Sequence, residues 1–326
     1  MSHQRYPSLD PIKEPHSISV KVLRLSRPSL VHQYPAAKPV LALSPGSSST
    51  ADSPASLSYQ SQSSHSSNPS PFLLSPILNL PVSFGSAYVG ETFSCTLCAN
   101  NDLPPDSSKA IRDVRIEAEM KTPGLGPAHK LDLEPNKGTD LQVGETLQKV
   151  VSFDLKEEGN HVLAVTVSYY EATDTSGRTR TFRKLYQFIC KASLIVRTKV
   201  GLLSNGQGND GRRRSWVLEA QLENCSEDAM QLEKVAMEVE KGLTYQDCNW
   251  EVNGGEKPVL HPGEVEQVCF VVAEREAMSD GLGDGNGGIL AVDGRITFGV
   301  LGIGWRGEMG NRGFLSTGKL GTRVAG

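Results

Sequence analysis

The feature that most constrains this chain is a strict two-residue alternation that starts directly after a glycine turn. Phe93, Cys95, Leu97 and Ala99 lie on one parity, and the residues between them are polar or small. A period of two over this length indicates a strand with one face on a core and the other toward solvent. Gly90, in the preceding Tyr-Val-Gly-Glu turn, can take a positive φ without a Cβ clash, so we expect it to open this strand.

The same arrangement recurs further along the chain, where Gly144 lies in a Val-Gly-Glu-Thr turn before an apolar segment at residues 147–155. This second unit is less regular, because Lys149 falls on the apolar parity and Val150 on the other. Two turn-then-strand units suggest an antiparallel sandwich. No sustained 3.6-residue period accompanies them, which disfavours a parallel βαβ fold.

Composition divides the chain. Residues 44–71 are rich in Ser, Pro and Gln and contain almost no bulky apolar side chains. Such a segment cannot bury enough surface to offset its chain entropy, so we expect it to be disordered. We predict an all-β protein with two tandem immunoglobulin-like antiparallel β-sandwich domains and this disordered Ser/Pro-rich insertion. The predicted order is an N-terminal arm at 1–43 with one strand at 17–25, the insertion at 44–71, the first sandwich at 72–191, the second sandwich at 192–306 and a poorly ordered Gly-rich tail at 307–326.

One segment of the second sandwich allows two interpretations. Ser226 is followed by two acidic residues and could cap a helix, whereas Val235, Met237 and Val239 alternate as in a strand. We favour the strand, because every neighbouring segment is predicted to be β. Two tryptophans of this sandwich, Trp216 and Trp305, are the expected anchors of its core, as Gly90 and Gly144 are the expected strand-opening turns.

Charge and sorting signals exclude several classes of function. The formal net charge is −4, so bulk electrostatics give no indication of nucleic acid or an anionic membrane as partner. The N-terminus lacks a signal-peptide core, and the apolar stretch at 18–25 is too short to span a bilayer. We therefore expect a cytosolic protein with its six cysteines reduced, and no glycan at the Asn224 sequon.

Three motifs suggest chemistry, but their contexts argue against it. The glycines at 283–288 fit a dinucleotide loop, although no helix is predicted after them. Residues 313–319 begin a P-loop pattern, but Leu320 replaces the Ser or Thr that would bind magnesium. Cys95 and Cys98 have a metal-like spacing, yet on a strand an offset of three directs them to opposite faces. We predict no catalytic residue, no cofactor and no metal site.

Several blocks of sequence, in conserved order along the chain, resemble one family, the trafficking protein particle (TRAPP) complex subunit 13 family, in a fungal-type version. They include VKVLRLSRPSL, LPVSFGSAYVGETFSCTLCANN, EEGNHVLAVTVSYYE and GIGWRGEMGNRGFLSTGKL. They lie at residues 20–30, 80–101, 111–122, 157–171, 182–188, 217–238 and 302–320. Members of this family usually continue into a further β-rich region after the block that ends here at Leu320.

The resemblance implies a non-catalytic subunit of the TRAPP vesicle-tethering complex, peripherally associated with Golgi and endoplasmic reticulum membranes. The implied partners are other TRAPP subunits and, indirectly, the Rab-type GTPase whose nucleotide exchange the complex promotes, in traffic between these compartments and in autophagy. Neither nucleic acid nor direct membrane insertion is expected. An arrestin-like cargo adaptor is the alternative, because the turn at residues 88–92 also resembles one that opens an arrestin-type strand. The absence of a Pro-Pro-x-Tyr motif from the sequence lowers that alternative.

Overall fold

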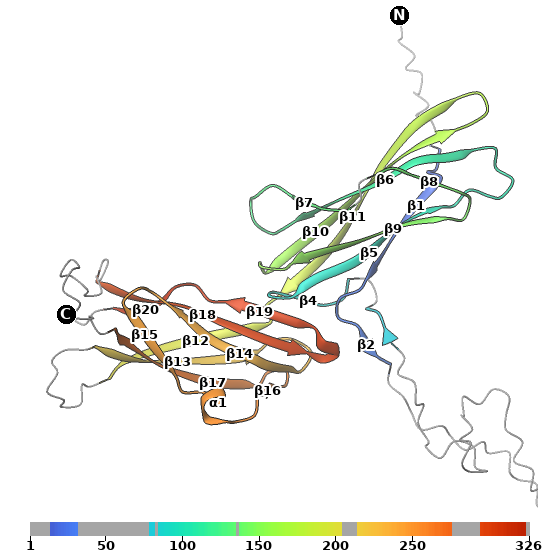
Figure 1. Ribbon diagram of the computed structural model, residues 1–326. Helices are drawn as coiled ribbons and strands as arrows, with labels where there is room; N and C mark the ends of the chain where they lie inside the picture. The colour runs from blue at the N-terminus through green and yellow to red at the C-terminus, as the bar shows by residue number, and fades with distance from the viewer. Residues whose placement is uncertain are drawn as a thin grey trace, which may run out of the picture.

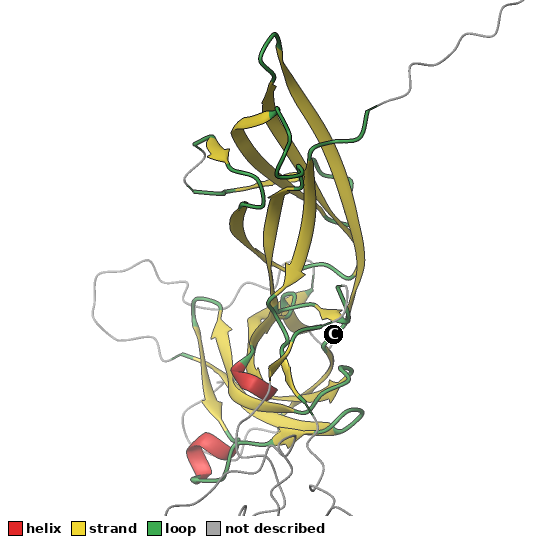
Figure 2. Ribbon diagram, turned by 90° about the vertical axis from the view of Figure 1, so that its right-hand side faces the viewer, coloured by secondary structure: helices red, strands yellow, loops and turns green. Residues whose placement is uncertain are grey.

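The computed structural model describes residues 14–31, 78–81, 84–134, 137–203, 214–275 and 294–323 (Figure 1). Regular structure in these ranges is almost entirely β, and the strands form two sandwiches that follow each other along the chain (Figures 1 and 2). The all-β prediction is therefore confirmed. The predicted disordered insertion at 44–71 lies outside the described residues.

The first sandwich consists of two facing sheets. The smaller sheet has the spatial order β1 (Ile18–Arg24), β5 (Thr92–Asn101) and β9 (Thr146–Asp154), with all pairs antiparallel. The larger sheet has the order β4 (Ala87–Tyr88), β11 (Gly177–Lys191), β10 (Gly159–Ala172), β6 (Ala110–Lys121) and β7 (His129–Leu131), and β8 (Thr139–Leu141) also pairs with β6. Only the short pair of β4 and β11 is parallel among these described strands. Both sheets contribute to one buried core.

The alternation of β5 is reproduced residue by residue, since Phe93, Cys95, Leu97 and Ala99 are each at most 1% exposed. The irregular pattern of β9 also has a physical reason. This strand lies at a sheet edge, where Val151 is buried while Val150 is 59% exposed.

The N-terminal strand is not a separate arm, and the structure corrects that prediction. β1 pairs with β5 from Ile18–Asn101 to Arg24–Cys95, so it completes the smaller sheet of the first sandwich. Ile18 and Val20 enter the core, because their parity faces the opposing sheet. Beyond β1, a short ribbon pairs β2 (Ser29–Leu30) with β3 (Leu78–Asn79).

The second sandwich has a four-stranded and a five-stranded sheet. The first has the order β12 (Leu194–Leu202), β13 (Ser215–Asn224), β17 (Val265–Glu274) and β15 (Leu243–Asp247). The second has the order β16 (Val259–Leu260), β14 (Met230–Val239), β18 (Arg295–Gly307) and β19 (Arg312–Ser316), with β20 (Leu320–Arg323) also paired to β18. A one-turn helix, α1 (Trp250–Asn253), and a 3-10 turn, η1 (Glu308–Gly310), connect strands.

The strands of the second sandwich test two predictions made from the sequence. The ambiguous segment at 226–240 forms strand β14, with a bulge between Leu232 and Lys234, so the strand interpretation is confirmed. The prediction of a poorly ordered tail at 307–326 is wrong for residues 307–323, because β19 and β20 both pair with β18. Their glycines suggested disorder, but Gly313 is buried and its lack of a side chain is required by packing.

Candidate functional site

In the described part of the chain, a turn of the first sandwich makes a backbone contact with the second sandwich. The turn at residues 88–91 lies against the outer edge of β19, which Figure 1 shows at the point where the two sandwiches meet. The Phe314 N–H donates to the Gly90 carbonyl oxygen at 2.9 Å, and Glu91 forms a β-bridge with Gly313. The first sandwich therefore extends the edge of the second by main-chain pairing.

Two glycines make room for Trp305 at this contact. Gly90 has a φ of +90°, and a Cβ built there would lie 2.6 Å from the Phe314 carbonyl oxygen and 2.6 Å from Trp305 Cη2. A Cβ at Gly313 would lie 2.2 Å from Trp305 Cε2. The indole, 2% exposed, thus occupies the space that both glycines leave.

The structure brings two of the four predicted structural residues together and leaves two apart. Gly90 and Trp305 meet at the contact between the sandwiches, although the sequence indicated only a turn and a core anchor. Gly144 has a φ of +79° in the turn before β9, and no neighbouring atom lies within 4 Å of a Cβ built there. Trp216 is 3% exposed in the second core, with its ring centroid 5.2 Å from that of Phe298.

A partly buried arginine, Arg27, with a side chain 14% exposed, contacts both sandwiches beside this turn. The Arg27 guanidinium lies 4.5 Å from the centroid of the Tyr88 ring, donates to Glu91 Oε1 at 2.6 Å and pairs with Asp228 of the second sandwich. Burial opposes the charge of Arg27, but Glu91 and Asp228 outweigh this effect and raise its pKa. The cation is therefore held between carboxylates from both sandwiches.

The loop at 226–228 of the second sandwich completes this contact. The Glu227 N–H donates to the hydroxyl of the fully buried Tyr88 at 3.1 Å, and the Glu227 carboxylate accepts from Ser86 at 2.8 Å and Lys191 at 3.0 Å. The loop itself is folded around Asn224, whose Nδ2 donates to the Asp228 and Leu260 carbonyls at 2.9 Å each. We call this set of contacts the junction. It comprises Arg27, residues 86–91, residues 226–228, Trp305 and residues 313–314.

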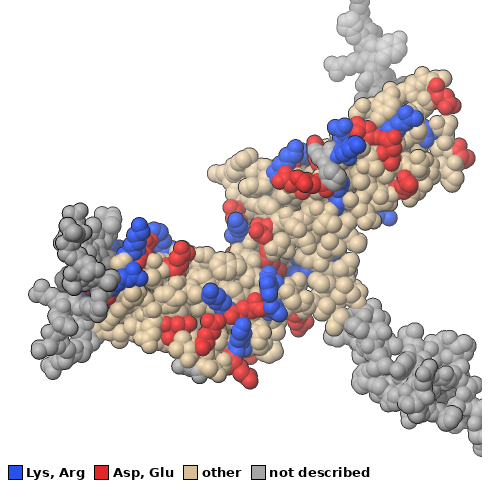
Figure 3. All heavy atoms as spheres, in the orientation of Figure 1, with Lys and Arg blue, Asp and Glu red and all other residues tan. Residues whose placement is uncertain are grey.

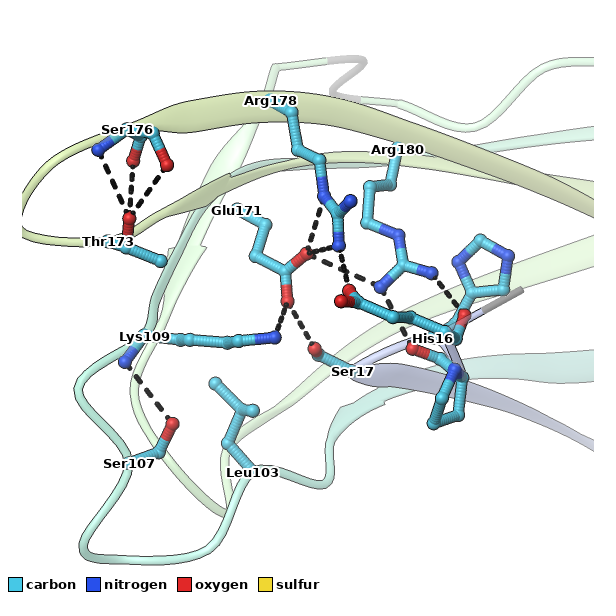
Figure 4. Close-up of polar contacts among 12 residues, drawn as sticks. His16, Ser17, Leu103, Ser107, Lys109, Glu171, Thr173, Ser176, Arg178 and Arg180 are labelled. Carbon is cyan, nitrogen blue, oxygen red and sulfur yellow. Dashed lines mark hydrogen bonds and ion pairs between the residues drawn. The ribbon is translucent and has the colours of Figure 1, made fainter. Parts of the chain in front are cut away.

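A second charged cluster lies in the first sandwich, with Glu171 at its centre (Figure 4). This residue is 2% exposed, and its Oε1 accepts from Ser17 at 2.8 Å and from Lys109 at 3.0 Å. Its Oε2 lies 3.3 Å from Arg178 Nε and 3.3 Å from Arg180 Nη1. Burial alone would raise the pKa of Glu171, but hydrogen bonds from Ser17, Lys109 and Arg178 outweigh burial and lower it to about 2.

The Glu171 cluster holds the chain that leads into β1. Arg180 donates to the carbonyl oxygens of Glu14 at 2.7 Å and Pro15 at 2.8 Å. The Tyr169 hydroxyl lies 3.1 Å from His16 Nδ1 and accepts from the Ser17 N–H at 3.2 Å. Residues 14–17 are thereby fixed to the hairpin of β10 and β11.

Sequence reasoning missed both clusters, although one signal was available. In β10, Val165, Val167, Tyr169 and Glu171 share one parity, and all are buried. A carboxylate in a row of core positions requires partners of opposite charge, because an isolated buried charge is costly. The junction has no comparable local signal, since Arg27 and Asp228 lie far apart in the sequence.

The described residues offer little for metal or nucleotide chemistry. No group of three or more His, Cys, Asp or Glu is placed to hold a metal ion in those ranges. Cys95 points into the core, where burial raises the pKa of its thiol to about 12, while Cys98 lies on the opposite parity. The P-loop-like residues 313–316 lie in β19, and the glycines at 283–288 are outside the described residues.

A pocket and a mixed-charge surface lie outside the junction and the Glu171 cluster. A pocket of about 450 Å³ beside β6 and β7 is lined by Ile116, Glu117 and residues 130–134. On the face shown in Figure 3, basic and acidic side chains are interspersed over both sandwiches, and several of them form ion pairs. No helix in the described part of the chain is both long and apolar enough to cross a membrane.

Comparison with known proteins covers both sandwiches. The family model "Trafficking protein particle complex subunit 13, N-terminal" matches residues 16–190, and the "middle domain" model of the same subunit matches residues 194–325. Proteins named trafficking protein particle complex subunit 13 from Xenopus laevis and Bos taurus are 27% and 26% identical to this chain. These matches cover 94% and 96% of this chain and 69% and 70% of the relatives.

A Drosophila melanogaster protein, named a probable homolog of this subunit, is 26% identical over 94% of this chain and 64% of its own length. A solved structure of a Porphyromonas gingivalis W83 protein of unknown function is 12% identical and covers 72% of this chain and 94% of its own. Its TM-score of 0.22 is too low to establish a shared fold. The two family models together span nearly all of the described residues, and the chain belongs to the trafficking protein particle complex subunit 13 family.

Proposed function

We propose that this chain is a non-catalytic subunit of the TRAPP vesicle-tethering complex and binds other subunits of that complex. The observation that carries the proposal is the pair of consecutive family models, which match residues 16–190 and 194–325. The relatives at 26–27% identity bear the name of a subunit of this complex, which supports a role in assembly.

In this proposal the two sandwiches act as one unit. Main-chain pairing of Gly90 with Phe314, together with Arg27 between Glu91 and Asp228, resists rotation of one sandwich against the other. A rigid subunit presents binding surfaces of both sandwiches without an ordering cost on association. The chain would thereby contribute scaffold contacts, while other subunits promote nucleotide exchange on a Rab-type GTPase.

The cellular setting follows from the same family. We propose a cytoplasmic protein that reaches Golgi and endoplasmic reticulum membranes through the complex, in traffic between these compartments and in autophagy. It would need neither a cofactor nor a catalytic residue for this role.

An arrestin-like cargo adaptor is the second candidate, and one observation favours it. Adaptors of that kind carry a polar core of buried charges between two domains. Here Arg27 and Glu91, with side chains 14% and 13% exposed, meet Asp228 between the sandwiches. Such an adaptor would bind the tails of membrane proteins through a sandwich edge.

A native pull-down of the tagged chain from cytosol distinguishes these functions. The scaffold proposal predicts recovery of a stoichiometric set of TRAPP subunits. The variant Gly90→Ala should reduce that recovery, because its Cβ would strike Phe314 and Trp305, whereas the matched variant Gly144→Ala should retain it. A ubiquitin ligase or membrane cargo, recovered without the TRAPP set, would support the adaptor and contradict the scaffold.

A further inference from the structure

Two cysteines of the second sandwich face each other across adjacent strands. The pairing of β15 with β17 ends at Asp247 opposite Phe270, so the next pair along the ladder is Cys248 and Cys269. The Cys248 N–H donates to the Cys269 carbonyl oxygen at 3.2 Å, which keeps the two residues opposite each other beyond the end of β15. Directly opposite residues of an antiparallel pair have Cα atoms about 4.5–5.5 Å apart, within the range that a disulfide requires.

A neighbouring side chain holds this pair in place. Asn249 Oδ1 accepts from the Cys269 N–H at 2.8 Å, and Asn249 is itself tied to Asp247 Oδ1 through its N–H at 2.9 Å and its Nδ2 at 2.6 Å. The first of these bonds connects the turn after β15 to β17, and the other two hold that turn in shape around Cys248. The backbones of Cys248 and Cys269 are thereby held opposite each other, which is the arrangement that a cross-strand disulfide requires.

Both thiols point to the outer face of the four-stranded sheet. Val268, Phe270 and Val272 of β17 face the core, so Cys269 lies on the opposite parity, and Cys248 beside it is exposed. Burial, the nearby Cys248 and Glu219 raise the pKa of the Cys269 thiol, and a hydrogen bond with the Cys248 side chain adds to this effect. The two thiols therefore lie on the same face of adjacent strands, and Cys248 is the more exposed of the two, so an oxidant in solution reaches it first.

We propose that Cys248 and Cys269 form a redox modification site, at which a peroxide converts the two thiols into a cross-strand disulfide. In the first step the Cys248 sulfur attacks hydrogen peroxide, giving a sulfenic acid and one water. In the second step the Cys269 sulfur displaces hydroxide from this sulfenic acid, which forms the S–S bond and a second water. The two thiols lose two electrons in total, and the peroxide is reduced by two.

The disulfide would link the edge strand β15 covalently to β17. β15 is a five-residue edge strand and pairs only with β17 in the described sheet. A covalent link at its end would also hold the adjoining helix α1. The expected consequence is slower amide hydrogen exchange in β15 and α1 of the oxidised protein, with the first sandwich unchanged.

The test is peptide mapping of the full chain after hydrogen peroxide treatment and alkylation of the remaining thiols, without reduction. Trypsin is unsuitable, because Lys257 is followed by Pro258 and both cysteines stay on one peptide. Cleavage after Glu separates them, and the expected product joins residues 241–251 to residues 267–274 and is two hydrogen atoms lighter than their sum. Reduction should release both peptides.

Variants and an internal control complete the test. Cys269→Ser should abolish the linked peptide and leave a Cys248 sulfenic acid that dimedone traps. Cys95 and Cys98 lie on opposite parities of β5, so their peptides should be recovered alkylated and not linked to each other. The proposal is overturned if peroxide yields no linked peptide, or if a mixture of ¹⁴N and ¹⁵N protein shows that the link joins two different chains.

Discussion

The junction and the Glu171 cluster use opposite charges for different purposes. At the junction a partly buried cation, Arg27, lies between two carboxylates, whereas in the cluster a buried anion, Glu171, lies among cations. The partners of Glu171 all belong to the first sandwich and the chain entering it, but Arg27 contacts both sandwiches. A charge surrounded by opposite charges therefore stabilises a single sandwich in the Glu171 cluster and relates two sandwiches at the junction.

This difference matters because buried ion pairs add little net stability compared with apolar packing, yet removing one partner is costly. A charge placed in this way selects one geometry over others. Glu171 selects the position of residues 14–17 on the β10–β11 hairpin, and Arg27 selects the orientation of the two sandwiches.

Replacing a core tryptophan should cause the largest loss in free energy of unfolding, with which the effects at the junction and the Glu171 cluster can be compared. Trp216→Ala removes a buried indole of the second core, far from Glu171, and should lower the free energy of unfolding by about 3–5 kcal/mol. Chemical denaturation measures this loss. A loss below about 1 kcal/mol would contradict the assignment of Trp216 as a core anchor.

Removing the buried anion should have the next largest effect. Glu171→Gln leaves Lys109, Arg178 and Arg180 without their shared carboxylate, and should lower the free energy of unfolding at pH 7 by about 3 kcal/mol. The control Glu119→Gln breaks an exposed pair with Arg183, 43% and 53% exposed, and should cost less than about 1 kcal/mol. Equal losses in the two variants would show that the burial of Glu171 has no energetic consequence.

How far the sequence predicts the fold depends on whether the signal is local. The alternation of β5 and the turns at Gly90 and Gly144 are local, and they predict strands that the structure contains. The glycines after residue 306 were misleading, because Gly313 lies in β19 and its missing side chain accommodates Trp305. The junction was beyond prediction, since its contacts join segments that only the complete fold brings together.

Acid should weaken the Glu171 cluster in a defined pH window. The folded pKa of Glu171, about 2, lies below its ordinary value of 4.5, so its stabilising contribution is present above pH 4.5 and is lost as the pH falls toward 2. The stability difference between wild type and Glu171→Gln should therefore shrink by about 2 kcal/mol between pH 7 and pH 3. Urea denaturation of both proteins across this range measures it, and a constant difference would contradict the assigned pKa.

A methyl group at the turn should separate the two sandwiches with a smaller effect on stability. Gly90→Ala and Gly144→Ala both place alanine at a positive φ, which costs about 1 kcal/mol or more in each variant. Only Gly90→Ala adds a contact with Phe314 and Trp305, so it should be less stable than Gly144→Ala by about 1–2 kcal/mol. Equal stabilities by chemical denaturation would show that the turn does not pack tightly on the second sandwich.

The orientation of the two sandwiches can be measured directly by residual dipolar couplings of backbone amides in the deuterated, weakly aligned protein. If the junction fixes both sandwiches as one unit, a single alignment tensor will fit the couplings of residues 87–191 and 194–323 in the wild type. In Gly90→Ala the two sandwiches should require different tensors, while Gly144→Ala should keep a single one. Two tensors of different magnitude in the wild type would contradict a rigid two-sandwich subunit.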